Sequence, residues 1–213
     1  MNGPLLILLE GANDLEFLVR LTGQLRRELP HLPDLTRWRA AGRIVLVPVG
    51  GGDPASWPNR LRPLGLPEFH LYDREQLPET NARQRAVDQV NARPDCRGAL
   101  TAKRSLENYL HPQAIASAGG GELEFGDHDS VSLLVARQRY EQVPPSLPWD
   151  SLLRRTQQRL AARAKRWLNT LAVEQMTADR LAERDPGGEV LGWLATIEAL
   201  AQESSTLPMA GLS

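Results

Sequence analysis

Short apolar runs punctuate the first hundred residues and predict strands. Leu5 to Leu9 is a continuous apolar run, which is typical of a strand buried on both faces. Similar runs predict strands at 42–49, 67–72 and 98–101. Helices are predicted between them, from Asn13 or Asp14 up to Pro30, over 55–64 and over 79–92. This order predicts an α/β protein with a Rossmann-like, mainly parallel four-stranded sheet flanked by helices.

The pattern changes after Leu110. Glycines and acidic residues over 119–129 predict a loop, and the proline-rich stretch at 143–148 predicts a second break. A long amphipathic helix is predicted over 149–173, followed by shorter helices at 177–184 and 188–202. We therefore expect a core over 1–115, a helical C-terminal extension packed on it over 116–203, and a tail over 204–213.

Composition narrows the class of protein. The 25 basic and 26 acidic residues give a net charge of −1, which argues against a protein that coats a polyanion over its whole surface. The single cysteine excludes a disulfide framework within the chain and a cysteine-rich zinc site. The N-terminal apolar run is too short to span a membrane and has no basic segment before it. We expect a cytoplasmic protein with no membrane partner.

Acidic residues follow three of the predicted strands. Glu10 ends the first strand and Asp14 lies just beyond it, Asp73 and Glu75 end the third, and Glu107 follows the fourth. Parallel sheets bind ligands at the carboxyl ends of their strands, so these acids are expected at one edge. Carboxylates that close repel one another unless cations neutralise them. Such oxygen ligands suit Mg²⁺ or Mn²⁺.

Each acid alone also has an ordinary interpretation. Glu10 is acceptable as a loop residue, and Asp14 as a helix-capping residue. The Asp73–Glu75 turn contains an arginine that offers an internal ion pair, and Glu107 lies close in sequence to two basic residues. The combination is stronger than its parts because one strand-end rule places all three groups.

Two segments resemble a known family. The stretch from Glu10 to Asp14 and the stretch from Tyr72 to Glu75 resemble a TOPRIM domain, the catalytic module of topoisomerases, primases and certain nucleases. TOPRIM is marked by a glutamate after strand one and Asp-x-Asp after strand three. Here Glu75 replaces the second aspartate. Residues 101–112 look like the segment after the fourth strand in the OLD (overcoming lysogenisation defect) nucleases. The resemblance covers about 4–115 and, more weakly, 165–169.

The resemblance implies a two-metal site and a catalytic lysine. By that resemblance, the metal ligands match Glu10, Asp14, Asp73, Glu75, Ser105 and Glu107. Lys165 matches the lysine that approaches the scissile phosphate, and Lys103 is the competing candidate. Two ions of this kind activate water and stabilise the leaving oxygen of an in-line displacement, and a nearby ammonium adds charge stabilisation.

OLD nucleases usually carry an ATPase, which this sequence does not show. The glycines at 50–52 are not followed by lysine, so they do not form a phosphate-binding loop of the Gly-x-x-x-x-Gly-Lys type. The ATPase is therefore absent or supplied by a separate subunit.

A basic stripe runs along the predicted long helix. Arg155, Arg159 and Arg163 fall within one arc, opposite an apolar arc. The stripe suits a phosphate backbone, and its ordinary interpretation is a solvated face. Together with Lys103 and Arg104 it forms the predicted DNA contact.

Three functions remain open at this stage. The first is a metal-dependent endonuclease hydrolysing phosphodiester bonds in DNA, with phage or plasmid defence as its implied setting. The second is a non-catalytic or partner-dependent subunit that binds metal or nucleic acid beside an ATPase. The third is primase-type nucleotidyl transfer, which ranks last because the zinc module of bacterial primases is missing.

Overall fold

The four predicted strands form one parallel sheet. The computed structural model describes residues 3–50, 54–142 and 147–206. The strands run parallel in the order β2-β1-β3-β4, which confirms the predicted α/β class. They are β1 (Leu5–Leu9), β2 (Ile44–Pro48), β3 (Glu68–Tyr72) and β4 (Cys96–Leu100). The central strands β1 and β3 are buried along their whole length, as expected for strands covered on both faces.

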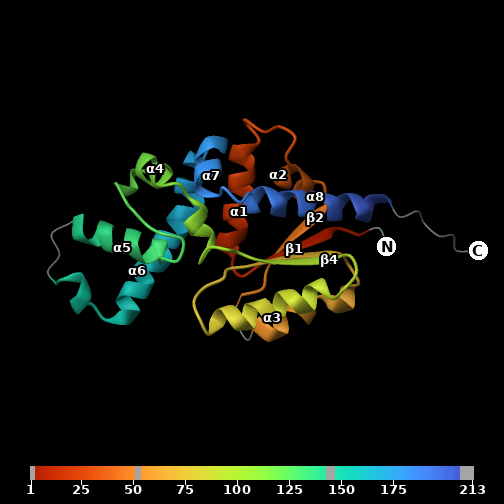
Figure 1. Cartoon of the computed structure of the whole chain (residues 1–213), viewed down its shortest axis with the longest axis horizontal. Coiled ribbons are helices and arrows are strands. Elements are labelled where there is room, and N and C mark those ends of the chain that lie inside the picture. Colours follow the sequence, from red (N-terminus) through yellow and green to blue (C-terminus); the bar gives the residue numbers. More distant parts are fainter. Residues whose placement is uncertain (1–2, 51–53, 143–146, 207–213) are drawn as a thin grey trace, which may run out of the picture.

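Alternation along the strands divides the core into two layers. Successive side chains of a strand point to opposite faces. The odd-numbered residues of β1 pack with α1 (Ala12–Leu25) and α8 (Glu189–Thr206). The even-numbered residues pack with α3 (Glu79–Asn91) and η1 (Pro54–Asn59). Figure 1 shows α8 and α3 on opposite sides of the sheet.

Helix α1 starts at the carboxyl end of β1 and is amphipathic, as predicted. Its buried residues include Leu15, Leu18 and Leu25. Extended Gly11 occupies the N-cap position, and no side chain caps the helix. Asp14 therefore lies in the first turn without acting as the cap, so its capping interpretation does not hold.

Two regions differ from the predicted elements. The helix expected over 55–64 is replaced by two 3₁₀ segments, η1 and η2 (Arg62–Leu64). Pro58 and Pro63 fall inside them and lack the backbone donor that an α-helix needs. A short helix that was not predicted, α2 (Leu35–Ala40), is capped by the Asp34 side chain, which accepts from the Arg37 amide at 2.9 Å.

The second half of the chain is helical. The predicted helix over 149–173 is interrupted at 152–153, where the backbone is extended. After residue 167 the chain stays helical but passes into irregular turns. Helix α5 was not predicted. The elements are η3 (Leu106–Tyr109), α4 (Pro112–Ile115), η4 (Ala116–Gly120), α5 (Val131–Gln142), η5 (Trp149–Ser151), α6 (Arg154–Trp167), η6 (Leu168–Ala172), η7 (Val173–Gln175) and α7 (Ala178–Arg184).

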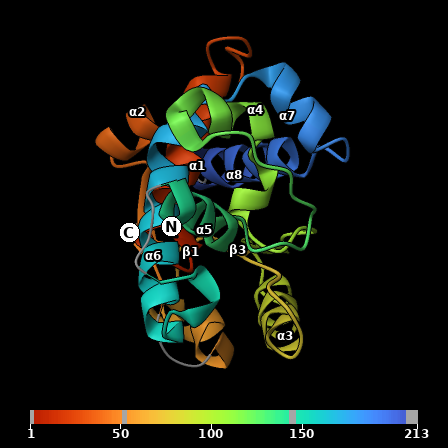
Figure 2. The same cartoon turned by 90° about the vertical axis from the view of Figure 1, so that its left-hand side faces the viewer.

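The hydrophobic core is continuous across the expected boundary at residue 115. Helix α8 lays Trp193, Leu194 and Ile197 over the sheet, in one cluster with Leu5 and Phe69. Helices α5 and α6 pack against each other and extend from the body of the molecule (Figures 1 and 2). The helical extension thus does two things: α8 closes the sheet, and α5 with α6 forms an arm.

Some sequence-based expectations fall outside the described residues. Glycines 51 and 52 and most of the expected tail, 207–213, are among them. Across the part of the chain that is described, no helix has the length and apolarity needed to cross a membrane.

Candidate functional site

The acids at the carboxyl edge of the sheet separate into two groups. Glu10 continues the even-numbered face of β1, which is covered by α3. Asp73 continues the odd-numbered face of β3, which is covered by α1 and α8. The strand-end rule predicted their shared edge, but the alternation of side chains sends them to opposite sides of it.

Three acids converge on the ammonium of Lys165, and we call these four residues the lysine cluster. The Lys165 Nζ lies 2.9 Å from Asp14 Oδ1, 3.6 Å from Asp73 Oδ2 and 3.6 Å from Glu107 Oε1. The acids come from α1, the loop after β3 and η3, and the lysine comes from α6. Sequence positions from 14 to 165 therefore meet at one point.

The lysine cluster contains more negative than positive groups, because three acids surround one ammonium. Burial raises the pKa of Asp14, and the Lys165 ammonium opposes that rise. Burial raises the pKa of Asp73 well above its ordinary value, again against Lys165 and with help from Asp14 and Glu107. Burial disfavours the Lys165 ammonium, but the three acids outweigh it and raise its pKa. One cation therefore serves three buried acids.

Several oxygen atoms in this region lack hydrogen bonds. Asp14 Oδ1 and Glu107 Oε1 are buried and approach the ammonium at ion-pair distance without a well-aligned hydrogen bond. Asp73 is better held, since its Oδ1 accepts from the Leu106 amide at 3.0 Å. Buried polar atoms left in this state are costly and call for an explanation.

Asn169 extends the cluster along the helix that carries Lys165. It follows Lys165 by four residues, so both lie on one helical face. Its Nδ2 donates to the Asn13 carbonyl at 3.2 Å, while its fully buried Oδ1 has no hydrogen-bond partner. It belongs to η6, a π-type turn, and π-turns are frequent at functional sites. The sequence-based reasoning gave Asn169 no role.

Glu10 is held by an arginine instead of the lysine. Arg83 Nε and Nη2 donate to its two carboxylate oxygens at 2.6 and 3.1 Å. Arg83 is a buried residue of α3 and shares a helical stripe with Ala86, Val87 and Val90. A charged residue on an otherwise apolar face was the signal that could have identified it. Glu10 still contributes to the raised pKa of both Asp14 and Asp73.

Glu75 lies in a loop that is hydrogen-bonded to the loop after β4. Its φ of 53° is in the left-handed region, which is uncommon for a residue other than glycine. Its amide donates to the Arg104 carbonyl at 2.8 Å, and its carboxylate is 3.4 Å from Arg104 Nε. The Thr101 hydroxyl also joins the two loops, by accepting a hydrogen bond from the Arg74 amide at 2.8 Å. Glu75 therefore lies outside the lysine cluster in this structure.

Ser105 and Asn108 organise the segment that carries Glu107. The Ser105 hydroxyl donates to Asn108 Oδ1 at 2.9 Å. The fully buried Asn108 in turn donates to the carbonyls of Gly126 and Asp129 at 3.0 and 3.1 Å. Both residues hold the backbone that presents Glu107, and the Ser105 hydroxyl is engaged in that role here.

Lys103 is buried and paired. Its Nζ lies 2.6 Å from Asp127 Oδ1 and 5.5 Å from the centre of the Tyr109 ring. Asp127 also pairs with Arg184 at 3.1 Å. Lys103 thus faces its own acid, away from the three acids that surround Lys165.

The arginine stripe of α6 is exposed, as its spacing predicted. Arg155, Arg159 and Arg163 are all exposed, and none forms an ion pair with another described residue. The stripe lies on the same helix as Lys165, one of the two helices of the arm (Figure 2). Lys165 lies apart from the stripe around this helix, because positions two residues apart, such as 163 and 165, are separated by about 200° about the axis.

The donor set fits a hard divalent cation, although a cation is already present in the form of lysine. Carboxylate oxygens and the Asn169 carbonyl oxygen are the ligands that Mg²⁺ and Mn²⁺ prefer. Among the residues whose structure is described, no three histidine, cysteine or acidic side chains are arranged around a common ion position. The centre of the acids is held by the Lys165 ammonium.

A second buried charge cluster lies along β3, and we call it the β3 network. Arg93 Nη2 lies 2.5 Å from Glu68 Oε2, and Glu68 Oε2 lies 2.6 Å from His70 Nε2. His70 Nδ1 lies 2.5 Å from the Tyr72 hydroxyl. His70 Nε2 therefore donates to Glu68, and the Tyr72 hydroxyl donates to His70 Nδ1. All three strand residues are on the α3 face, at most 1% exposed.

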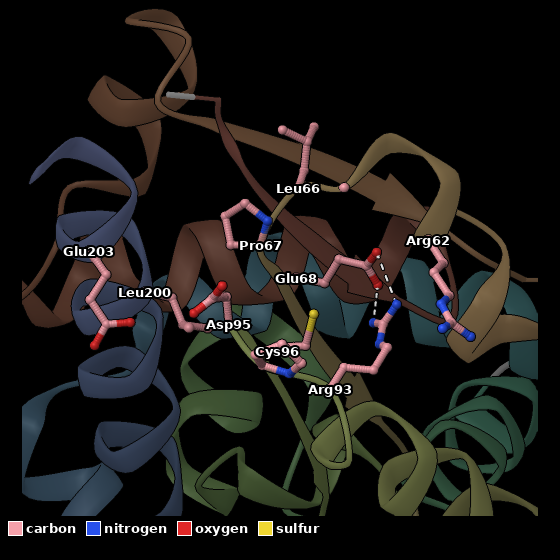
Figure 3. Close-up of a pocket in the computed structure, with 11 residues that line it drawn as sticks. Arg62, Leu66, Pro67, Glu68, Arg93, Asp95, Cys96, Leu200 and Glu203 are labelled. Atoms are coloured by element: carbon pink, nitrogen blue, oxygen red, sulfur yellow. Dashed lines mark hydrogen bonds and ion pairs between the residues drawn. The ribbon is translucent and has the colours of Figure 1, made fainter. Parts of the chain in front are cut away.

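The far end of the β3 network borders a cavity. The cavity has a volume of about 300 Å³ and is lined by Glu68, Arg93, Cys96 and Leu200, among others. Figure 3 shows the Glu68–Arg93 pair on its wall. It lies at the amino end of β3, at the opposite end of the strand from Asp73.

Searches of protein-family models, curated proteins and solved structures find no match for this chain.

Proposed function

We propose that this protein is a metal-dependent nuclease that hydrolyses phosphodiester bonds in DNA through a TOPRIM-like site. The observation that carries the proposal is the convergence of Asp14, Asp73 and Glu107 on one buried cation position at the carboxyl edge of a parallel sheet. Here one ammonium serves three buried acids, and Glu107 Oε1 and Asn169 Oδ1 have no hydrogen-bond partner. Magnesium or manganese, when bound, supplies water activation and leaving-group stabilisation.

The residues of the chain divide the remaining work. Asp14, Asp73 and Glu107 provide the anionic oxygens that hold cations at the sheet edge. Lys165 supplies a positive charge beside them, suited to an anionic phosphate. The arginine stripe on α6 binds the phosphate backbone and steers the DNA towards that edge. Arg83 fixes the Glu10 carboxylate on the other face of the sheet.

The test is cleavage of supercoiled plasmid with Mg²⁺ or Mn²⁺. Wild type is compared with Asp73→Asn and Glu107→Gln, which keep the side-chain shape and remove the charge. Both are expected to lose at least about 100-fold in rate, corresponding to loss of part of the several kcal/mol that metal-assisted chemistry supplies. The control is Glu141→Gln, which changes an exposed acid of α5. Variants that cut as fast as wild type would place the chemistry elsewhere.

A second function is favoured by the position of Lys165. Its ammonium fills the centre of the acids, and Glu10 is neutralised by Arg83. Such a site also suits a partner-dependent or non-catalytic subunit that binds nucleic acid beside an ATPase provided by another chain. Wild type that binds DNA yet does not cut it with either metal, and gains activity only with an added partner, would support this function.

A further inference from the structure

The lysine cluster already contains a cation, and that cation is the side chain of Lys165. Its Nζ stands where oxygens from three elements meet, at 2.9, 3.6 and 3.6 Å. An ammonium at these distances fills the space around which the acids are gathered. Mg²⁺ sits about 2.1 Å from its ligands, so the same oxygens must draw inward to bind it. No room for the ammonium then remains between them.

Electrostatic repulsion also prevents the Lys165 ammonium and a divalent ion from occupying the cluster together. An ammonium and a divalent ion within about 3 Å of each other repel strongly in a buried site. The three acids, by contrast, share a single positive charge, and Glu107 Oε1 lies 3.6 Å from it without a hydrogen bond. A divalent ion compensates them better than lysine does. The two cations therefore compete for one set of acids.

Lys165 has a way out of the cluster. Its side chain is 28% exposed, whereas the side chains of Asp14 and Asp73 are 5% exposed. The lysine thus lies on the solvent side of the acids. Its four-carbon stem is flexible and its head is strongly hydrated.

We propose that Lys165 and a divalent metal ion are alternative occupants of the same carboxylate position, so that metal binding displaces the ammonium to the rim of the site. The inference rests on the proposed function for the identity of the competing cation. Lysine keeps the acids together while no metal is bound. Once displaced, it stands beside the metal, where its charge suits an arriving phosphate.

The composition of the chain makes this exchange measurable. The sequence contains only two lysines, Lys103 and Lys165. Both are paired with acids, but Lys103 faces Asp127 and not the three acids. Protein labelled with ¹³C at lysine Cε therefore gives two side-chain signals, one from the cluster and one from a built-in control. A Lys103→Met variant assigns them.

The experiment is a Mg²⁺ titration of metal-stripped, labelled protein, followed by NMR, with metal affinity measured by calorimetry. We expect the Lys165 signal to move to the position of a hydrated lysine while the Lys103 signal stays in place. Lys165→Met is expected to bind Mg²⁺ about tenfold more tightly or better, because the metal-competent state no longer has to expel the lysine. Lys103→Met is expected to bind Mg²⁺ like wild type.

The outcomes separate the exchange from the nuclease activity. Wild type that binds Mg²⁺ and cuts DNA while the Lys165 signal stays fixed overturns the exchange and leaves the proposed function intact. Displacement of Lys165 by Mg²⁺ without DNA cleavage supports the exchange and removes the proposed function. Absence of Mg²⁺ binding to both wild type and Lys165→Met overturns both. The wild-type NMR titration decides the exchange even if Lys165→Met does not fold.

Discussion

Two buried charge clusters at opposite ends of β3 differ in how completely their charges are compensated within the chain. In the β3 network, Glu68 accepts from both Arg93 and His70, and His70 accepts from Tyr72. In the lysine cluster, three acids share one ammonium and two oxygens have no hydrogen bond. The first arrangement is nearly complete within the chain. The second leaves three acids with one positive charge between them, an imbalance that is typical of functional sites.

The pKa directions follow the same division. Burial would raise the pKa of Glu68, but the hydrogen bonds from His70 and Arg93 lower it below its ordinary value. Burial raises the pKa of Asp73, and Lys165 does not compensate. One carboxylate is therefore stabilised in its charged form and the other is not. Removing the negative charge of Glu68 should accordingly lower stability, whereas removing that of Asp73 with the side-chain shape kept should not.

The largest expected effect comes from breaking the β3 network at its centre. Glu68→Ala leaves Arg93 and His70 without their shared acceptor and should lower the free energy of unfolding by about 3–5 kcal/mol. Urea denaturation measures it. Glu141→Ala, at an exposed pair on α5, should change it by less than about 0.5 kcal/mol. A loss at Glu68 as small as that control would mean that the network does not stabilise the fold.

The second prediction concerns pH and uses His70. Burial lowers the pKa of His70 below its ordinary 6.5, against the influence of Glu68. As the pH falls through 6.5, His70 becomes protonated in the unfolded chain but stays neutral in the folded chain. The free energy of unfolding therefore decreases. The contribution is up to about 1.4 kcal/mol per pH unit. His70→Gln should remove this part of the slope. Urea denaturation of both proteins between pH 7 and pH 5 tests it, and equal slopes would refute the assignment.

A smaller effect is expected at the end of the network. Tyr72→Phe removes the hydroxyl that donates to His70 Nδ1 and should cost about 0.5–1.5 kcal/mol. The ring, which packs 5.4 Å from that of Trp57, is retained. Thermal denaturation provides the measurement, and an unchanged melting temperature would indicate that water replaces the hydroxyl.

The smallest effect is expected at Asp73, the residue after Tyr72, and here the substitution should not lower stability. Asp73→Asn, in metal-free buffer, should leave stability unchanged or raise it by roughly 1 kcal/mol, because it removes one of three buried charges. The asparagine oxygen still accepts from the Leu106 amide, so Asp73→Ala is the contrast and should destabilise. The raised pKa of Asp73 means that its penalty is present at neutral pH and disappears as pH falls towards 3.8. The gain should shrink accordingly, and a gain independent of pH would contradict this origin.

The strands and the shared edge of the acids were readable from sequence because both follow from local patterns. The apolar run at 5–9 and the acids after each strand needed no knowledge of distant contacts. Helix α5 escaped prediction because its apolar residues cluster at its first turns, from Val131 to Val135, and do not form a stripe along it. Pro58 and Pro63 converted a predicted helix into 3₁₀ turns.

The partners within the site were not readable, because they are chosen by tertiary packing. Glu10 pairs with Arg83, 73 residues away, since α3 covers that face of the sheet. Lys165 lies 2.9 Å from Asp14, a partner 151 residues away that no local pattern specifies. Periodicity gives the face on which a residue lies, but not the side chain that will stand opposite it.

The late position of α8 in the chain affects how the protein is made. Its residues 190–201 cover the sheet whose first strand lies at residues 5–9, so the ribosome must synthesise nearly two hundred residues before that apolar face is closed. Until then the apolar side chains on that face of the sheet lack the cover that α8 provides. Translation that stops early should therefore yield a chain that depends on chaperones or aggregates. The residues of the lysine cluster all precede α8, so they are synthesised before the helix that covers this face of the sheet.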